Sequence, residues 1–215
     1  MQAAATRRTQ AERREATTSK LLDATIGCLA NLGYARTSVA AICASAGVSQ
    51  GALFRHFATR RDVIVAAADA IGRQHIEQFD AAARGLKRDA YRRIVLLIRG
   101  LCRTPTHAAW REIMVAARTD TELRVQASQG LERFEAMLIA TSGRFLGIDG
   151  KAAKRAAVVL LSIMHMFDSE AMTVVVFGNE PLETQRIKWA TEMLKRELSE
   201  LSPPLSPRVG GTARR

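Results

Sequence analysis

The side chains whose chemistry is easiest to assign lie in a short segment that begins at Ser49. The amide of Gln50 can bond an adenine edge in two places, and the guanidinium of Arg55 can reach a guanine or a phosphate. Ala52 and Phe54 are suited to contact a thymine methyl group or a sugar edge. Together these residue types predict contact with double-stranded DNA, and the alternative interpretation is a solvated surface helix.

Two short predicted helices, over residues 37–44 and 49–57, position this segment. They are separated by the turn Ser45-Ala46-Gly47, where glycine permits the backbone that a steep helix crossing requires. Cys43 supplies a small side chain where the two helices touch. Such a helix-turn-helix presents the beginning of its second helix to the major groove. The apolar residues expected to hold the unit together are Ile42, Ala46, Val48 and Leu53, with Leu22, Ile26 and Leu29 from the preceding helix.

Hydroxyl, imidazole and basic side chains near helix ends suit phosphate contacts, which orient a protein on DNA without reading its sequence. Thr37, Ser38, His56 and Arg60 are predicted to make such contacts. The predicted DNA-binding residues are Thr37, Ser38, Ser49, Gln50, Gly51, Ala52, Phe54, Arg55, His56 and Arg60.

The run from Gly33 to Ile64, GYARTSVAAICASAGVSQGALFRHFATRRDVI, resembles the DNA-binding domain of the tetracycline-repressor (TetR) family of bacterial regulators. The resemblance covers about residues 15–65, and the remainder is similar to the family in helix count, length and order. It implies an all-helical homodimer whose C-terminal domain binds a small molecule that controls release from DNA. Two positions depart from the family's pattern. Phe54 replaces the usual tyrosine, which removes a hydroxyl available to a phosphate, and Cys43 replaces the commoner alanine.

Helical periodicity, five prolines and 5% aromatic residues predict an all-α chain of about nine helices, without a credible strand. We expect a basic flexible arm over residues 1–14 and a helix-turn-helix DNA-binding domain over 15–62. A helical effector-binding and dimerisation domain would follow over 63–201, and then a disordered tail over 202–215. The predicted helix starts in the body are Thr59, Thr104, Asp120, Asp149 and Pro181.

Positive charge is concentrated in the first quarter of the chain. Residues 1–61 carry nine basic and three acidic side chains, within a formal net charge of +11 for the whole chain. A basic segment on a nearly neutral body is typical of a protein that contacts a polyanion with one of its parts. The arm, with Arg7, Arg8, Arg13 and Arg14, either adds salt-dependent phosphate affinity or remains solvated.

The last predicted helix places Ile187, Ala190, Leu194 and Leu198 on one apolar stripe, at spacings of three and four residues. The helix before it is apolar nearly all round. The two helices therefore predict a four-helix interface between two subunits, with these four residues in it. Burial of the stripe within one chain is the alternative.

Apolar faces that carry a few polar groups predict a pocket in the body for a small apolar or amphipathic effector, although the same pattern also fits an ordinary core. Trp110 and Met114 share one such face, and Phe134, Met137 or Leu138, and Thr141 form another. His165 and Asp168 are polar residues within an apolar helix. The candidate pocket residues are Trp110, Met114, Phe134, Met137, His165 and Asp168.

The three cysteines and four histidines show no metal-ligand spacing, so we expect neither a metal nor a cofactor. We expect buried, unreactive thiols rather than a redox switch. The longest apolar stretches fall short of the roughly 18 residues that a membrane span needs. No nucleophile–base pair, carboxylate pair or phosphate-binding glycine loop supports an enzyme.

The sequence therefore predicts a cytoplasmic, dimeric transcriptional regulator. We expect a repressor that a small molecule releases from a palindromic operator, with the helix over 59–83 as the lever between ligand and DNA. The alternative is a constitutive DNA-binding dimer without an effector.

Overall fold

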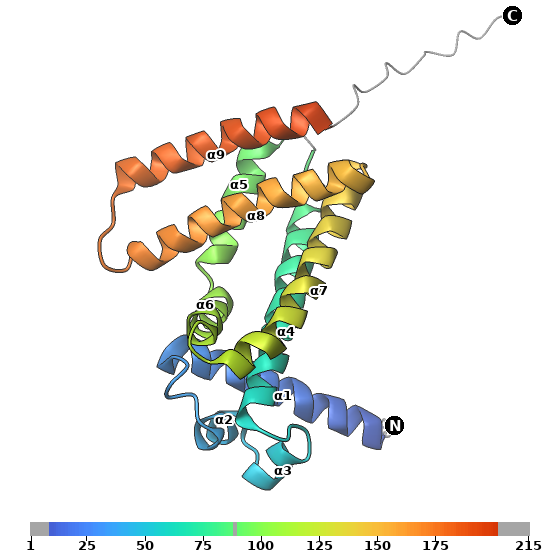
Figure 1. Ribbon diagram of the computed structural model, residues 1–215, viewed down its shortest axis with the longest axis vertical. Coiled ribbons are helices and arrows are strands. Elements are labelled where there is room, and N and C mark those ends of the chain that lie inside the picture. Colours follow the sequence, from blue (N-terminus) through green and yellow to red (C-terminus); the bar gives the residue numbers. More distant parts are fainter. Residues whose placement is uncertain (1–8, 88–89, 202–215) are drawn as a thin grey trace, which may run out of the picture.

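The computed structural model describes residues 9–87 and 90–201, and these residues form nine helices and no strand (Figure 1). The all-α prediction is thereby confirmed. α2 and α3 lie at one end of the molecule, and α8 and α9 lie at the other (Figure 1). The helices are α1 (Gln10–Leu32), α2 (Val39–Ala46), α3 (Gln50–Phe54), α4 (Arg60–Ala83), α5 (Tyr91–Cys102), α6 (Pro105–Ala117), α7 (Thr121–Leu146), α8 (Gly150–Thr173) and α9 (Glu180–Leu201).

Local capping signals start α4, α6 and α7 where the sequence predicted them. Asp149 precedes α8 without a side-chain cap bond, and α9 begins at Glu180, one residue before the predicted Pro181. Ahead of α4, the Asp62 amide donates to the Thr59 hydroxyl (3.1 Å) and the Thr59 amide donates to the Asp62 carboxylate (2.9 Å). Thr104 caps α6, with Pro105 at the first helical position. α7 ends at Gly147, whose left-handed backbone (φ 67°, ψ 41°) suits glycine.

α1 begins earlier than predicted. The Glu12 amide donates to the Thr9 hydroxyl (3.2 Å), and the Thr9 amide donates to the Glu12 carboxylate (2.7 Å). This capping box starts the helix at the residue after Thr9. The flexible arm predicted over 1–14 is therefore wrong for residues 10–14, which are helical. Residues 1–8 of the arm and the tail predicted over 202–215 lie outside the described residues.

Three clusters of buried apolar side chains follow one another through the molecule. The first joins α1, α2, α3 and the start of α4, and includes Ile42, Leu53 and Val63. The second joins α1, α4, α6 and α7 and includes Ile64, whereas the third joins α4, α5, α7, α8 and α9. Because Val63 and Ile64 belong to different clusters, α4 connects the end that carries α2 and α3 to the body. The domain boundary predicted between residues 62 and 63 thus falls within a continuous helix.

The apolar stripe of α9 belongs to the core of its own chain. Ala190, Leu194 and Leu198 are buried in the third cluster, and Ile187 packs against it. The prediction that Ala190, Leu194 and Leu198 form a subunit interface is therefore wrong, whereas Ile187 is only partly buried and its assignment to the interface stays a prediction. The three buried residues pack inward because α5 and α8 offer α9 an apolar surface within the same chain.

One side of α8 faces away from the core. Its most apolar 18-residue window has a mean hydropathy of 1.2, and 44% of that window is buried. By length and composition alone α8 can cross a membrane, contrary to our expectation from the sequence. Its buried side, which includes Ile163 and Phe167, packs into the third cluster, as core helices of the same composition do.

Cys28, Cys43 and Cys102 are all buried and free. Burial raises the pKa of each thiol, and for Cys102, where Asp168 adds to the effect, the pKa reaches about 12. Because the thiolate is the reactive form, these thiols are unreactive in the folded protein. The structure therefore supports their interpretation as small buried side chains.

Candidate nucleic-acid interface and body cavity

α2, the turn at Gly47 and α3 form a compact helix-turn-helix, which we call the recognition unit. Ser38 caps α2 by accepting from the Ala41 amide, and Ser49 caps α3 by accepting from the Ala52 amide, each at 3.1 Å. Gly47 has the left-handed conformation (φ 66°, ψ 36°) that turns the chain between the helices. The turn and the two serine caps thus fix the direction of α3 relative to α2.

The recognition unit exposes the start of α3 at the end of the molecule farthest from α9 (Figure 1). Phe54 is 49% exposed although its neighbour Leu53 is fully buried. Arg55 lies back along α3, because its Nε donates to the Gly51 carbonyl (3.3 Å). The predicted contacts that the structure leaves exposed are Ser38, Ser49, Gln50, Gly51, Phe54 and Arg55, with Ala52 partly buried.

Thr37 does not belong to this surface. It is fully buried, and its hydroxyl donates to the Gly33 carbonyl (2.8 Å). Its predicted phosphate contact is therefore wrong. Thr37 and Ser38 are adjacent hydroxyl residues in the sequence, and only the structure shows that Ser38 is the exposed cap of α2.

Arg60 and His56 are partly buried and hold the recognition unit to the rest of the chain. Nε of Arg60 donates to the Thr37 carbonyl (2.6 Å), and a second nitrogen donates to the Tyr34 carbonyl. The Arg60 guanidinium also lies over the Tyr34 ring, 4.5 Å from its centre. Nδ1 of His56 is 2.9 Å from the Thr18 hydroxyl of α1. These contacts give both side chains a structural role that the sequence did not predict.

The body contains a small cavity of about 40 Å³ between α4, α5, α6, α7 and α8. A second cavity of about 10 Å³ adjoins it and is also lined by Trp110. The larger cavity has room for one or two water molecules, well below the roughly 300 Å³ at which ligand pockets begin. Side chains that line both cavities are His75, His107, Phe134 and Met164.

A polar group stands on one side of this apolar cavity. Nε2 of His107 is 2.8 Å from Oδ1 of Asp168, and Arg111 donates to the same oxygen (3.0 Å). Although burial raises it, the pKa of Asp168 is held below its usual value by these two bonds. Because an ionised carboxylate only accepts hydrogen bonds, Nε2 of His107 is the donor.

His75 of α4 faces His107, with 5.0 Å between the ring centres. Burial, together with His107, lowers the pKa of His75 to about 4. The imidazole is therefore neutral at pH 7. Within the described part of the chain, its buried Nε2 has no hydrogen-bond partner.

The structure brings together only some of the pocket residues predicted from the sequence. Phe134 and Trp110 line the cavities, and their rings pack 6.4 Å apart. Asp168 lines neither cavity, but it is hydrogen-bonded to His107, which lines both. His165 is exposed on the outer side of α8, so its assignment to the pocket is wrong.

The two methionines predicted for the pocket also lie elsewhere. Met114 packs against the second cluster, and Met137 lines neither cavity, whereas its predicted alternative, Leu138, lines the larger one. Sequence reasoning missed His75 and His107 because each helix was considered alone. One signal was available: His75 lies four residues from both Ile71 and Phe79, on a buried stripe of α4.

α6 carries contacts to both the cavity and the recognition end of the molecule. His107 and Arg111 bond to Asp168, whereas the next residue, Glu112, accepts from the Tyr34 amide (2.9 Å). Tyr34 lies between α1 and α2, and its hydroxyl donates to Asp120 (3.4 Å). A shift of α6 would therefore displace Tyr34, which lies just before the recognition unit.

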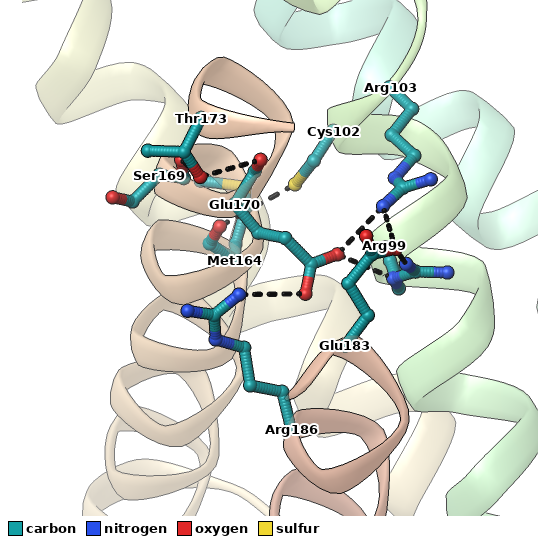
Figure 2. Close-up of polar contacts among 9 residues, drawn as sticks. All are labelled: Arg99, Cys102, Arg103, Met164, Ser169, Glu170, Thr173, Glu183 and Arg186. Atoms are coloured by element: carbon teal, nitrogen blue, oxygen red, sulfur yellow. Dashed lines mark hydrogen bonds and ion pairs between the residues drawn. The ribbon is translucent and has the colours of Figure 1, made fainter. Parts of the chain in front are cut away.

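An ionic cluster joins α5, α8 and α9. Figure 2 shows Glu170 facing Arg99 and Arg103 on one side and Arg186 on the other. Oε1 of Glu170 accepts from Arg99 (2.6 Å) and Arg103 (2.9 Å), and Oε2 accepts from Arg186 (3.5 Å). Glu183 accepts from Arg99 of α5 and from Arg103, the residue after α5, and the bond from Arg103 lowers the pKa of Glu183. The cluster fixes the pair α8–α9 on the body.

A helix-turn-helix with an exposed second helix, carried on an all-helical body, defines a DNA-binding regulator. The family model described as "Bacterial regulatory proteins, tetR family" matches residues 21–67. An uncharacterized HTH-type transcriptional regulator of Mycobacterium bovis is 34% identical over 189 residues, covering 87% of this chain and 97% of that protein. The chain therefore belongs to the TetR family of bacterial transcriptional regulators and is a DNA-binding protein.

Solved structures share the fold at lower identity. A transcriptional regulator of Streptomyces coelicolor A3(2) superposes with a TM-score of 0.65 at 15% identity, covering 85% of this chain and 98% of that one. The transcriptional regulator FadR of Bacillus subtilis, in complex with stearoyl-CoA, gives 0.53 at 18% identity, with coverage of 87% and 99%. The nine-helix arrangement is thus that of solved TetR-family regulators.

Proposed function

We propose that the protein is a cytoplasmic, dimeric repressor that a small molecule releases from a palindromic operator. The observation that carries the proposal is the exposed surface of α3, with Gln50 at its start and Phe54 and Arg55 at its end, on a helix capped by Ser49. The N-terminal part of such a helix reads base edges in the major groove. The exposed caps Ser38 and Ser49 suit contacts with phosphates on either side of it.

Replacing Gln50 with alanine is expected to weaken binding to the operator by about 1–3 kcal/mol, because a bidentate amide–adenine contact has that value. Binding to scrambled DNA should not change. Fluorescence anisotropy at about 0.15 M salt, with the chain's own upstream region as the specific DNA, measures both affinities. Gln78→Ala, on the exposed side of α4, is the matched control. An equal loss on both DNAs would show that Gln50 does not read sequence.

The outer sides of α8 and α9 are the surface that we propose for dimerisation. Exposed residues repeat at spacings of three and four along both helices, and Val158, Met172 and Trp189 are each half exposed or more. The predicted interface helices are thus retained, but with the opposite face outward. Pairing of this face across a two-fold axis would make a four-helix bundle. The two copies of α3 would then contact two operator half-sites whose centres lie about 34–36 Å apart. The exposed stripes are Val158, Ser162, His165, Ser169 and Met172 on α8, and Leu182, Gln185, Trp189, Glu192 and Arg196 on α9.

Trp189→Glu is expected to convert the dimer to a monomer, because it places a charge where a 57%-exposed tryptophan would be covered. Operator affinity should fall strongly because a monomer contacts one half-site only. Sedimentation equilibrium gives the mass, with Gln78→Glu as the control for added charge. A Trp189→Glu protein that stays dimeric would move the interface away from α9.

Release by an effector is supported by the position of α6 between the cavity and Tyr34, and by α4, which belongs to both ends of the molecule. A neighbour of the same fold, FadR, was solved with stearoyl-CoA. The second candidate is a constitutive DNA-binding dimer, and the observation that favours it is the small volume of the cavity. An effector that lowers operator affinity at constant salt would exclude this second candidate.

A further inference from the structure

We infer that the effector is a neutral, largely apolar molecule with one hydroxyl group, which hydrogen-bonds to His75 in the body cavity. The inference rests on the proposed function, since it names the chemistry of the molecule that would release the DNA. It is carried by three features of the cavity: an unpaired buried nitrogen, the lack of a free charge beside it, and walls that are otherwise apolar.

Nε2 of His75 is buried without a partner, on a side chain that is only 7% exposed. An unpaired buried polar atom is costly, and such atoms are rare in folded proteins. A ligand that supplies the missing hydrogen bond recovers this cost at the moment of binding. Because His75 lines both cavities, a molecule that enters either one meets this nitrogen.

The charged groups near His75 are already matched to one another. Oδ1 of Asp168 in α8 accepts hydrogen bonds from His107 and Arg111 of α6, so the charges of Asp168 and Arg111 are paired with each other. His75 itself is neutral at pH 7. An ionised group entering the cavity would therefore be desolvated without a counter-charge, which is unfavourable. A neutral ligand avoids this penalty.

A hydroxyl suits His75 better than other neutral polar groups. A neutral imidazole has one nitrogen that donates and one that accepts. A hydroxyl can do either, so it can pair with Nε2 in both tautomers. The remaining walls, from Ile76, Phe79, Phe134 and Leu138, require an apolar body for the rest of the molecule.

Space for such a molecule comes from Met164 of α8. Its side chain lines both cavities, and methionine is unbranched and readily changes its conformation. Displacement of Met164 would merge the two volumes around His75. Its backbone carbonyl accepts from the Cys102 thiol (3.5 Å; Figure 2), a contact that does not involve the Met164 side chain.

The test uses the full chain and three probes with one skeleton: 4-ethylphenol, ethylbenzene and 4-ethylbenzoate. Isothermal titration calorimetry at about pH 7.5 gives their affinities. We expect 4-ethylphenol to bind about tenfold more tightly than ethylbenzene, the size of one buried hydrogen bond, and 4-ethylbenzoate to bind most weakly. Tighter binding of 4-ethylbenzoate than of 4-ethylphenol would overturn the inference, as would the absence of binding by all three.

Two variants locate the binding site. His75→Leu should abolish the preference for 4-ethylphenol over ethylbenzene, whereas Gln78→Leu, which alters an exposed residue of the same helix α4, should retain it. Met164→Ala enlarges the cavity and should bind 4-ethylphenol several-fold more tightly. A preference that survives in His75→Leu, or an unchanged affinity in Met164→Ala, would place the probe elsewhere and overturn the inference.

Operator anisotropy in the presence of 4-ethylphenol separates this inference from the proposed function. Binding that depends on His75 but leaves operator affinity unchanged would support the site and contradict ligand-controlled release. Release of DNA by a molecule that binds independently of His75 would support the proposed function and overturn the inference.

Discussion

Glu170→Ala is expected to lower the free energy of unfolding by about 3 kcal/mol, the lower end of the range for removing one partner of a buried ion pair. The Glu170 side chain is 1% exposed and accepts from Arg99, Arg103 and Arg186. Its loss leaves Arg186 without that partner, whereas Arg99 and Arg103 keep Glu183. This retained partner is the reason for the lower end of the range. Urea unfolding at constant protein concentration measures the change, because the proposed dimerisation would make apparent stability depend on concentration.

Arg186→Gln is the matched control for Glu170→Ala. Arg186 is one-third exposed and lies 3.5 Å from Glu170, so its removal should cost less than about 1 kcal/mol. A Glu170→Ala protein within about 0.5 kcal/mol of the wild type would show that the cluster does not hold α8 and α9 on the body.

Leu53→Ala is expected to cost about 2–5 kcal/mol, because Leu53 is fully buried in the small cluster beneath the recognition unit. Leu53 is the buried residue of α3, so the change should loosen α3 and weaken operator binding. Urea unfolding and operator anisotropy measure the two effects.

The neighbouring residue gives the control. Phe54 is 49% exposed, so Phe54→Ala should change the free energy of unfolding by no more than about 0.5 kcal/mol. Its effect should appear in operator affinity alone. If Phe54→Ala destabilises the protein as much as Leu53→Ala does, the assignment of Phe54 to the DNA surface is wrong.

The sequence by itself determined the features that depend on neighbours within a few residues. Thr59 with Asp62, Thr104 with Pro105, and Gly147 each define a helix end through local hydrogen bonds and backbone preference. The helix-turn-helix could be predicted for the same reason, since its caps and its glycine turn lie within about 20 residues. The same logic would have extended α1 to Thr9 had the Thr9–Glu12 capping box been recognised.

Only the tertiary structure decided which surface covers each side chain. An apolar stripe shows that a helix side is covered but not by which partner, and so Ala190 and Leu194 were assigned to a second subunit although α5 and α8 cover them. Thr37 and Arg60 were assigned to DNA because the sequence does not show that they bond inside the protein. The cavity around His75 was missed for the same physical reason. It exists only where five helices meet, and no local pattern records contacts between residues so far apart in the chain.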